Sequence, residues 1–238
     1  MKKSKSLIHL YFKILLCFLF VNVGFSQSNE NSDLEGWSSI TLKYKHNKKL
    51  SFELEEQLRL DENISETKKY FTQLSTSYSV FKNFDIGVGA RFIRENDNEG
   101  KIQGYENHFR FHIDASYKQK IDQFTLKYRL RYQNKNEMGI SSEEGDVANQ
   151  NLRFKTSLGY NIKKWKLDPK FAAEIFNHFE KDEESEFNKY RLTLSTDYEF
   201  KKLGTLGLFY RIEKELNQTF NEKTNIIGLK YTYTIKNK

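Results

Sequence analysis

The stretch Phe124-Thr-Leu-Lys-Tyr-Arg-Leu-Arg-Tyr132 alternates apolar and polar residues without a break. Because successive side chains of a β-strand point to opposite faces, it predicts a strand with one apolar face and one charged face. The same alternation recurs at 36–45, 50–60, 69–80, 84–95, 105–118, 123–133, 150–161, 166–179, 188–200, 205–215 and 224–236. The sequence therefore predicts an all-β protein of about 10–12 strands.

These expected strands are long, and their connections are of two kinds. A strand of about ten residues, rising about 3.3 Å per residue and tilted by about 40°, covers roughly the 25 Å apolar layer of a membrane. Short turns are expected at 46–49, 81–83, 119–122, 162–164 and 201–204, and longer polar segments at 61–68, 96–104, 134–149, 180–187 and 216–223. Short turns at one rim and long loops at the other predict an antiparallel up-and-down transmembrane β-barrel.

Aromatic residues gather near the ends of the expected strands, as in the girdles that hold a barrel at both headgroup layers. Those near the short turns are Tyr78, Phe81, Phe84, Tyr117, Phe124, Tyr160, Trp165, Tyr198 and Phe200. Those near the long loops are Tyr70, Phe71, Phe92, Tyr105, Tyr132, Phe179 and Tyr190. The only proline, Pro169, is expected early in its strand, where a missing amide costs least.

One feature of the count does not fit an up-and-down barrel. If the short turns face the periplasm, strand 36–45 runs inward and should follow an outward strand. Residues 27–35 are too polar and irregular to form that strand. Either the N-terminal segment passes through or over the barrel, or the strand count is wrong by one.

The N-terminus has the form of a secretory signal peptide. Basic residues precede an apolar run centred on 14–21, and Gly24 and Ser26 are small residues suited to cleavage before Gln27. We therefore expect a cleaved signal over 1–26, a barrel domain over 27–238 and a bacterial outer-membrane location. The only cysteine, Cys17, lies in the signal, so the mature chain has no disulfide and no cysteine zinc site.

Charge and hydropathy narrow the expected partners. The signal contributes four lysines and no acid, so cleavage lowers the net charge from +7 to +3, which is too small an excess to indicate nucleic-acid binding. A mean hydropathy of −0.76 excludes a helical membrane protein but not a barrel, where only alternate residues meet lipid. The expected partners are outer-membrane lipid, lipopolysaccharide and the barrel-assembly machinery.

The polar face of the expected strands would line the lumen. It carries a basic ladder of Arg110, Lys127, Arg129, Arg131, Arg153 and Lys155. Its candidate acidic partners are Glu106, Asp114, Glu174 and Asp197. Buried charges must be paired or hydrated, so two interpretations remain open: an anion-attracting constriction in a narrow channel, or a structural ion-pair network in a filled barrel.

Two alternatives of other classes were weighed against a non-enzymatic barrel. His108 and His112 share one face of a strand, and either could serve as the base of a lipid-acting enzyme, although no serine-nucleophile motif is present. They are about 13 Å apart along the strand, too far to bind one metal, and neither a metal nor a cofactor is expected. The other alternative is a soluble periplasmic β-sandwich or lipid-binding barrel with its apolar faces turned inward.

Several short segments resemble a known family. They are Gly36-Trp37-Ser38, Glu55-Glu56-Gln57-Leu58-Arg59, Arg91-Phe92-Ile93-Arg94-Glu95-Asn96, Tyr105-Glu106-Asn107-His108 and Tyr128-Arg129-Leu130-Arg131-Tyr132-Gln133. Together they are similar to the domain of unknown function 2490 family over essentially the whole mature chain. The resemblance implies an exported bacterial protein with a β-barrel fold, and it carries no established activity to these residues.

Overall fold

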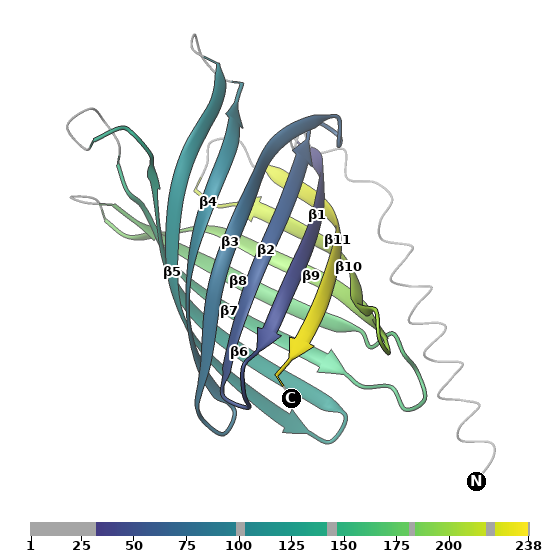
Figure 1. Ribbon diagram of the computed structural model, residues 1–238. Coiled ribbons are helices and arrows are strands. Elements are labelled where there is room, and N and C mark those ends of the chain that lie inside the picture. The colour runs from purple at the N-terminus through teal and green to yellow at the C-terminus, as the bar shows by residue number, and fades with distance from the viewer. Residues whose placement is uncertain (1–31, 99–102, 142–146, 181–183, 218–221, 238) are drawn as a thin grey trace. The chain divides into compact units, whose positions relative to one another are not determined.

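The computed structural model describes residues 32–98, 103–141, 147–180, 184–217 and 222–237, and in this part of the chain it is a closed β-barrel of eleven strands (Figure 1). The strands are β1 (Ser32–Lys45), β2 (Leu50–Asp61), β3 (Glu66–Phe81), β4 (Phe84–Asp97), β5 (Gly104–Ile121), β6 (Phe124–Glu137), β7 (Asn149–Tyr160), β8 (Lys170–Phe179), β9 (Glu186–Phe200), β10 (Gly204–Glu215) and β11 (Lys223–Lys236). All eleven expected strands are present, which confirms the all-β barrel.

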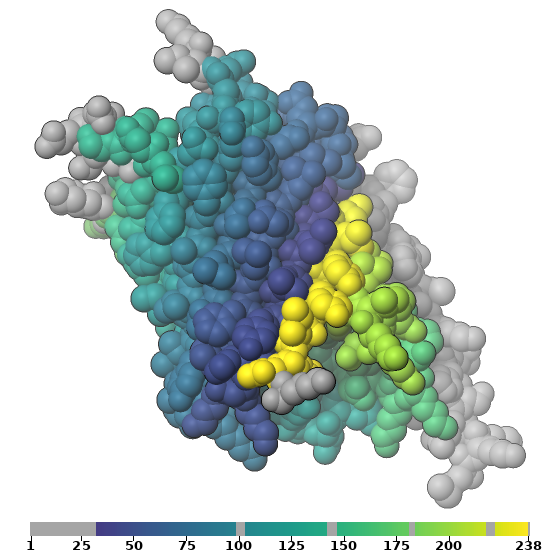
Figure 2. All heavy atoms as spheres, viewed as in Figure 1, coloured from purple at the N-terminus to yellow at the C-terminus, as the bar shows by residue number. Residues whose placement is uncertain are grey.

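Every pair of consecutive strands is antiparallel, but the barrel closes through a parallel seam between β1 and β11. Ser32 lies opposite Lys223 and the register continues without a shift to Lys45 and Lys236. In Figure 1 the arrowheads of both strands point to the same rim, and in Figure 2 their residues pack side by side along the seam. Both strands therefore run from the long-loop rim to the short-turn rim, which answers the question raised by strand 36–45.

Two connections differ clearly from the prediction. The segment expected as a long loop at 61–68 is a tight turn of residues 62–65, in which the Ser65 amide donates to the Asp61 carbonyl at 3.0 Å. The connection expected as a short turn at 162–164 spans 161–169. Pro169 therefore lies just before β8 rather than inside it, and only its carbonyl joins the sheet, accepting from the Tyr160 amide at 3.1 Å.

Apolar side chains cover the outside of the wall. Large exposed apolar residues at mid-strand include Ile40, Leu54, Leu74, Val88 and Leu208, drawn from five different strands. The polar residues of the same strands face inward, so the expectations of a β-sandwich and of a lipid-binding barrel with inward apolar faces are wrong about the fold and about the direction of these faces. One aromatic assignment is also wrong, because Phe71 is 2% exposed and lies inside the barrel instead of in the outer girdle.

Two glycines make room for rings inside the barrel. A Cβ atom on Gly228 would lie 1.9 Å from Cζ of Phe209, the residue directly opposite it on β10. A Cβ atom on Gly89 would lie 2.4 Å from Cε1 of His112 on β5. Such contacts are shorter than van der Waals distance, so these two rings lie flat against the wall only because the opposite residue is glycine.

The expected signal peptide, 1–26, lies outside the described residues and stays a prediction. No helix among the described residues is long and apolar enough to cross a membrane.

Candidate functional site

The inward side chains enclose a cavity of about 1010 Å³. Its basic lining residues are Lys43, Arg59, Lys69, Arg91, Arg110, Lys127, Arg129, Arg131, Lys135, Lys155, Arg153, Lys189, Arg191, Arg211 and Lys230. Its acidic lining residues are Glu53, Glu55, Asp85, Asp114, Glu174 and Asp197. Cations therefore outnumber carboxylates among the residues that line this cavity, although Glu95 and Glu213 next to it pair with four of these cations.

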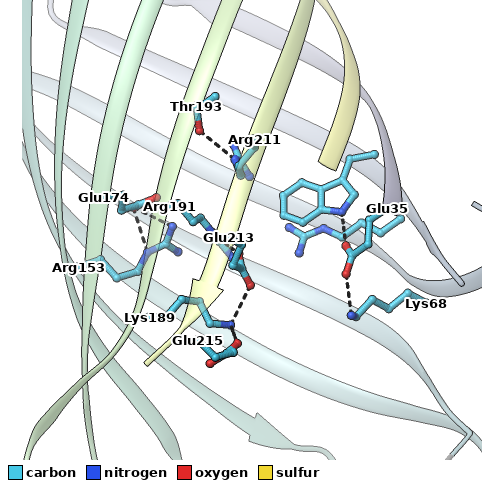
Figure 3. A network of polar contacts seen from close by, with 12 residues as sticks. Glu35, Lys68, Arg153, Glu174, Lys189, Arg191, Thr193, Arg211, Glu213 and Glu215 are labelled. Carbon is cyan, nitrogen blue, oxygen red and sulfur yellow. Dashed lines mark hydrogen bonds and ion pairs between the residues drawn. The ribbon is translucent and has the colours of Figure 1, made fainter. Parts of the chain in front are cut away.

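Half of the predicted basic ladder forms ion pairs. Arg131 binds Asp114 through both ends of its guanidinium, with Nε–Oδ1 at 2.6 Å and Nη2–Oδ2 at 2.7 Å. Oε1 of Glu174 accepts from Nη2 of Arg129 at 2.7 Å and from Nη2 of Arg153 at 2.8 Å (Figure 3 shows the second contact). These charge-assisted contacts join strands β5 to β8 across the inner wall.

The other half of the ladder has no such partner. Arg110, Lys127 and Lys155 line the cavity, and none forms an ion pair with a described residue. Among the predicted acids, Asp197 pairs with Lys170 near the short-turn rim. Glu106, the fourth of these acids, is not among the residues that line the cavity, and its Oε2 lies 3.3 Å from Nε2 of His108.

A second set of ion pairs lies toward the long-loop rim and was not assigned from the sequence (Figure 3). Glu213 on β10 accepts from Arg191 and, at 2.9 Å, from Lys189, both on β9. Buried Glu35 on β1 accepts from Lys68 at 2.8 Å. These contacts fix β1 to β3 and β9 to β10, on either side of the parallel seam.

Aromatic rings inside the barrel carry stacked arginines. The guanidinium carbon of Arg59 lies 3.6 Å from the ring centroid of Trp37, and that of Arg91 lies 3.4 Å from the centroid of Phe71. Trp37 is 6% exposed, and its Nε1 donates to Oε2 of Glu35 at 2.6 Å. Desolvated cation–π contacts of this kind contribute about 2 kcal/mol each.

The stacking continues around the opposite wall. Arg153 and Arg191 lie 4.4 Å and 4.6 Å from the Phe176 centroid, and Arg211 lies 4.9 Å from that of Phe209. We call this set the arginine–aromatic layer: Trp37, Arg59, Phe71, Arg91, Arg153, Phe176, Arg191, Phe209 and Arg211. The layer consists of large, mutually packed side chains inside the barrel, on strands β1 to β4 and β7 to β10.

Toward the short-turn rim the inward side chains are smaller. Cavity-lining positions there include Ser75, Ser77, Gly87, Thr205 and Thr232. The unpaired Lys127 lies among them.

Both candidate histidines are buried in the wall. His108 lies 3.7 Å from Oε2 of Glu95, which also accepts from Lys69 and Lys135. His112 is packed over Gly89. The Nδ1 atoms of both rings have no hydrogen-bond partner among the described groups. The enzyme alternative stays untested by these contacts.

A model of the family described as protein of unknown function (DUF2490) matches residues 34–225. The chain belongs to the DUF2490 family. The match extends from β1 into β11 and so includes the arginine–aromatic layer and both sets of ion pairs. No curated protein matches the chain in sequence.

Proposed function

We propose that this DUF2490 protein is an outer-membrane β-barrel whose lumen is a narrow channel for small anionic solutes. The observation that carries the channel is the excess of cations over carboxylates around the cavity of about 1010 Å³. Rings of basic side chains attract anions and give pores their anion preference. Lys127 and Lys155 support this role because neither is neutralised by an ion pair with a described residue.

The apolar outer wall and its aromatic rims support the membrane location. Phe81 stacks on Phe84 with ring centroids 4.7 Å apart at the short-turn rim, and Tyr70 lies 6.3 Å from Tyr105 at the other. In this placement the short turns face the periplasm, and lipopolysaccharide surrounds the long loops. Insertion by the barrel-assembly machinery belongs to the same proposal.

Fractionation and a heat-modifiability gel test the location. A membrane barrel should sediment with outer membranes and migrate faster before boiling than after it. Recovery of the folded chain in the soluble fraction without detergent would contradict the proposal.

Planar-bilayer recordings test the channel. We expect single-channel currents with a chloride preference, and we expect Lys127→Glu with Lys155→Glu to lower the chloride-to-potassium permeability ratio severalfold. Lys163→Glu, an exposed change in the 161–169 connection, is the matched control and should leave the ratio unchanged. If the parent, the double variant and the control have the same permeability ratio, the cationic lumen does not determine the selectivity.

A structural barrel with a closed lumen is the second candidate, and the arginine–aromatic layer favours it. Its packed rings and guanidinium groups line the cavity on seven of the eleven strands, and such side chains restrict a conducting path. The absence of conductance in a correctly folded, membrane-inserted protein would decide for this candidate.

Glu56 allows a further test of the membrane location. It is exposed at the middle of β2, on the outer face between Leu54 and Leu58, and its Oε2 accepts from Thr72 at 2.9 Å. In lipid, this carboxyl is costly, so Glu56→Leu should raise the free energy of unfolding in vesicles by about 1 kcal/mol. Glu199→Leu at the short-turn rim is the control. A loss of stability in Glu56→Leu would contradict lipid exposure of this face.

A further inference from the structure

Two arginines face each other across β4 and β5 without a carboxylate between them. Arg91 and Arg110 are directly opposite in the strand register. Like charges in this arrangement are destabilising, and burial makes an uncompensated charge costly. Arg91 is only 8% exposed, and neither arginine forms an ion pair within the described ranges.

The nearby acids are committed to other cations or lie too far away. Asp114 is bound at both oxygens by Arg131. Glu55 also lines the cavity, but it forms no ion pair with either arginine. Gln73 separates it from Arg91 in the register, and its Oε1 takes both Nε and Nη2 of Arg91 at 2.9 Å and 2.7 Å.

The surroundings of Arg110 are more cationic still. In the strand register Arg110 lies between Arg91 on β4 and Lys135 on β6. Its own Nε is buried and has no hydrogen-bond partner among the described atoms. Arg110 is thus surrounded by like charges and has a buried N–H donor without a partner. These are the properties expected of one side of an anion-binding site.

We propose that Arg91 and Arg110 together bind a phosphate-type oxyanion inside the lumen. A guanidinium group presents paired N–H donors that match two oxygens of a tetrahedral oxyanion, and Arg110 supplies them here. Arg91, whose Nε and Nη2 donate to Gln73, adds the second positive charge that matches a doubly charged anion. The site rests on the proposed function, since the anion reaches it through the cationic lumen. The cavity has the volume of a small-molecule site and accommodates inorganic phosphate or a small phosphate ester.

Calorimetric titration of the refolded mature chain with inorganic phosphate, at constant ionic strength in chloride, tests the site. We expect saturable binding that chloride does not abolish. Arg110→Gln should weaken it at least about tenfold, because charge-assisted contacts to the anion are lost. Arg94→Gln, the same change on the outer face of β4, is the matched control and should bind as the parent does.

A purely structural role for Arg110 predicts that Arg110→Gln is less stable than the parent and that phosphate has no different effect on the two proteins. The anion site predicts the opposite. Because Arg110 has no described partner to lose, Arg110→Gln should fold and be at least as stable as the parent in phosphate-free buffer, and phosphate should stabilise the parent more than the variant. Arg110→Lys keeps the positive charge but lacks the paired N–H donors of the guanidinium, so it should also weaken phosphate binding. It replaces Arg110→Gln in the test if that variant does not fold.

The outcomes separate this site from the channel. Phosphate binding without bilayer conductance would support the oxyanion site and contradict the channel. Conductance without saturable phosphate binding would support the channel and contradict the site. Equal affinity in the parent, Arg110→Gln and Arg94→Gln would overturn the site.

Discussion

Glu174→Gln is expected to lower the free energy of unfolding by about 3–5 kcal/mol, the usual result of removing one partner from a buried ion pair. Glu174 is 7% exposed and accepts from both Arg129 and Arg153. In the register it lies between Lys155 on β7 and Arg191 on β9, so the neutral variant leaves a group of buried cations without a carboxylate. Urea unfolding of the refolded barrel in vesicles, followed by circular dichroism, measures the loss.

The matched control is Glu199→Gln on β9, which is exposed at the short-turn rim and forms no ion pair with a described residue. We expect a change within about 0.5 kcal/mol there. A loss below about 1 kcal/mol in Glu174→Gln would mean that water in the lumen already screens these arginines.

Trp37→Ala should have a comparable effect, a loss of about 3–5 kcal/mol, because it removes a large buried side chain from a packed layer. The ring supports Arg59 at 3.6 Å, lies 4.8 Å from Arg211 and meets the Phe209 ring edge-on at 6.4 Å. The same variant removes a large side chain from the lining of the cavity. If the barrel conducts, its single-channel conductance should therefore rise.

The chain supplies its own control for Trp37. Trp165, in the 161–169 connection, is 58% exposed, so Trp165→Ala should cost much less stability and leave conductance unchanged. Equal losses from the two variants would contradict the packing of the arginine–aromatic layer. Unchanged conductance in a folded Trp37→Ala protein would show that the layer does not limit the current.

Alternation along single strands was sufficient to predict the barrel and the inward face. Arg129, Arg131 and Arg153 all point inward as the two-residue period requires. The two-residue period does not tell how far along the barrel axis a side chain lies, however. That position determines which side chains are close enough to form ion pairs. The alternation places both Glu106 and Glu174 on the inward face. Only Glu174 lies at the level of the arginines, because the strands are staggered around the barrel.

The arginine–aromatic layer was missed because aromatic residues were assigned to the lipid face by type. Phe71 is on the same face of β3 as Gln73 and Ser75, which line the cavity, so the alternation itself indicates an inward ring. The short-range signals for turns were weaker: residues 62–65 close tightly although Glu62, Asn63 and Ile64 must all adopt positive φ. Such conformations are unusual for residues other than glycine, so sequence favoured a longer loop.

The parallel seam sets the order in which this fold can be completed. Each antiparallel hairpin joins neighbours along the chain and can pair as soon as its two strands are available. The β1–β11 pairing joins the first strand of the barrel to the last, so it gains nothing until all the others are in place. Until then β1 and β10 present unpaired edges to any other chain. Truncation before Lys223 would therefore leave an open sheet that is prone to associate, rather than a smaller barrel.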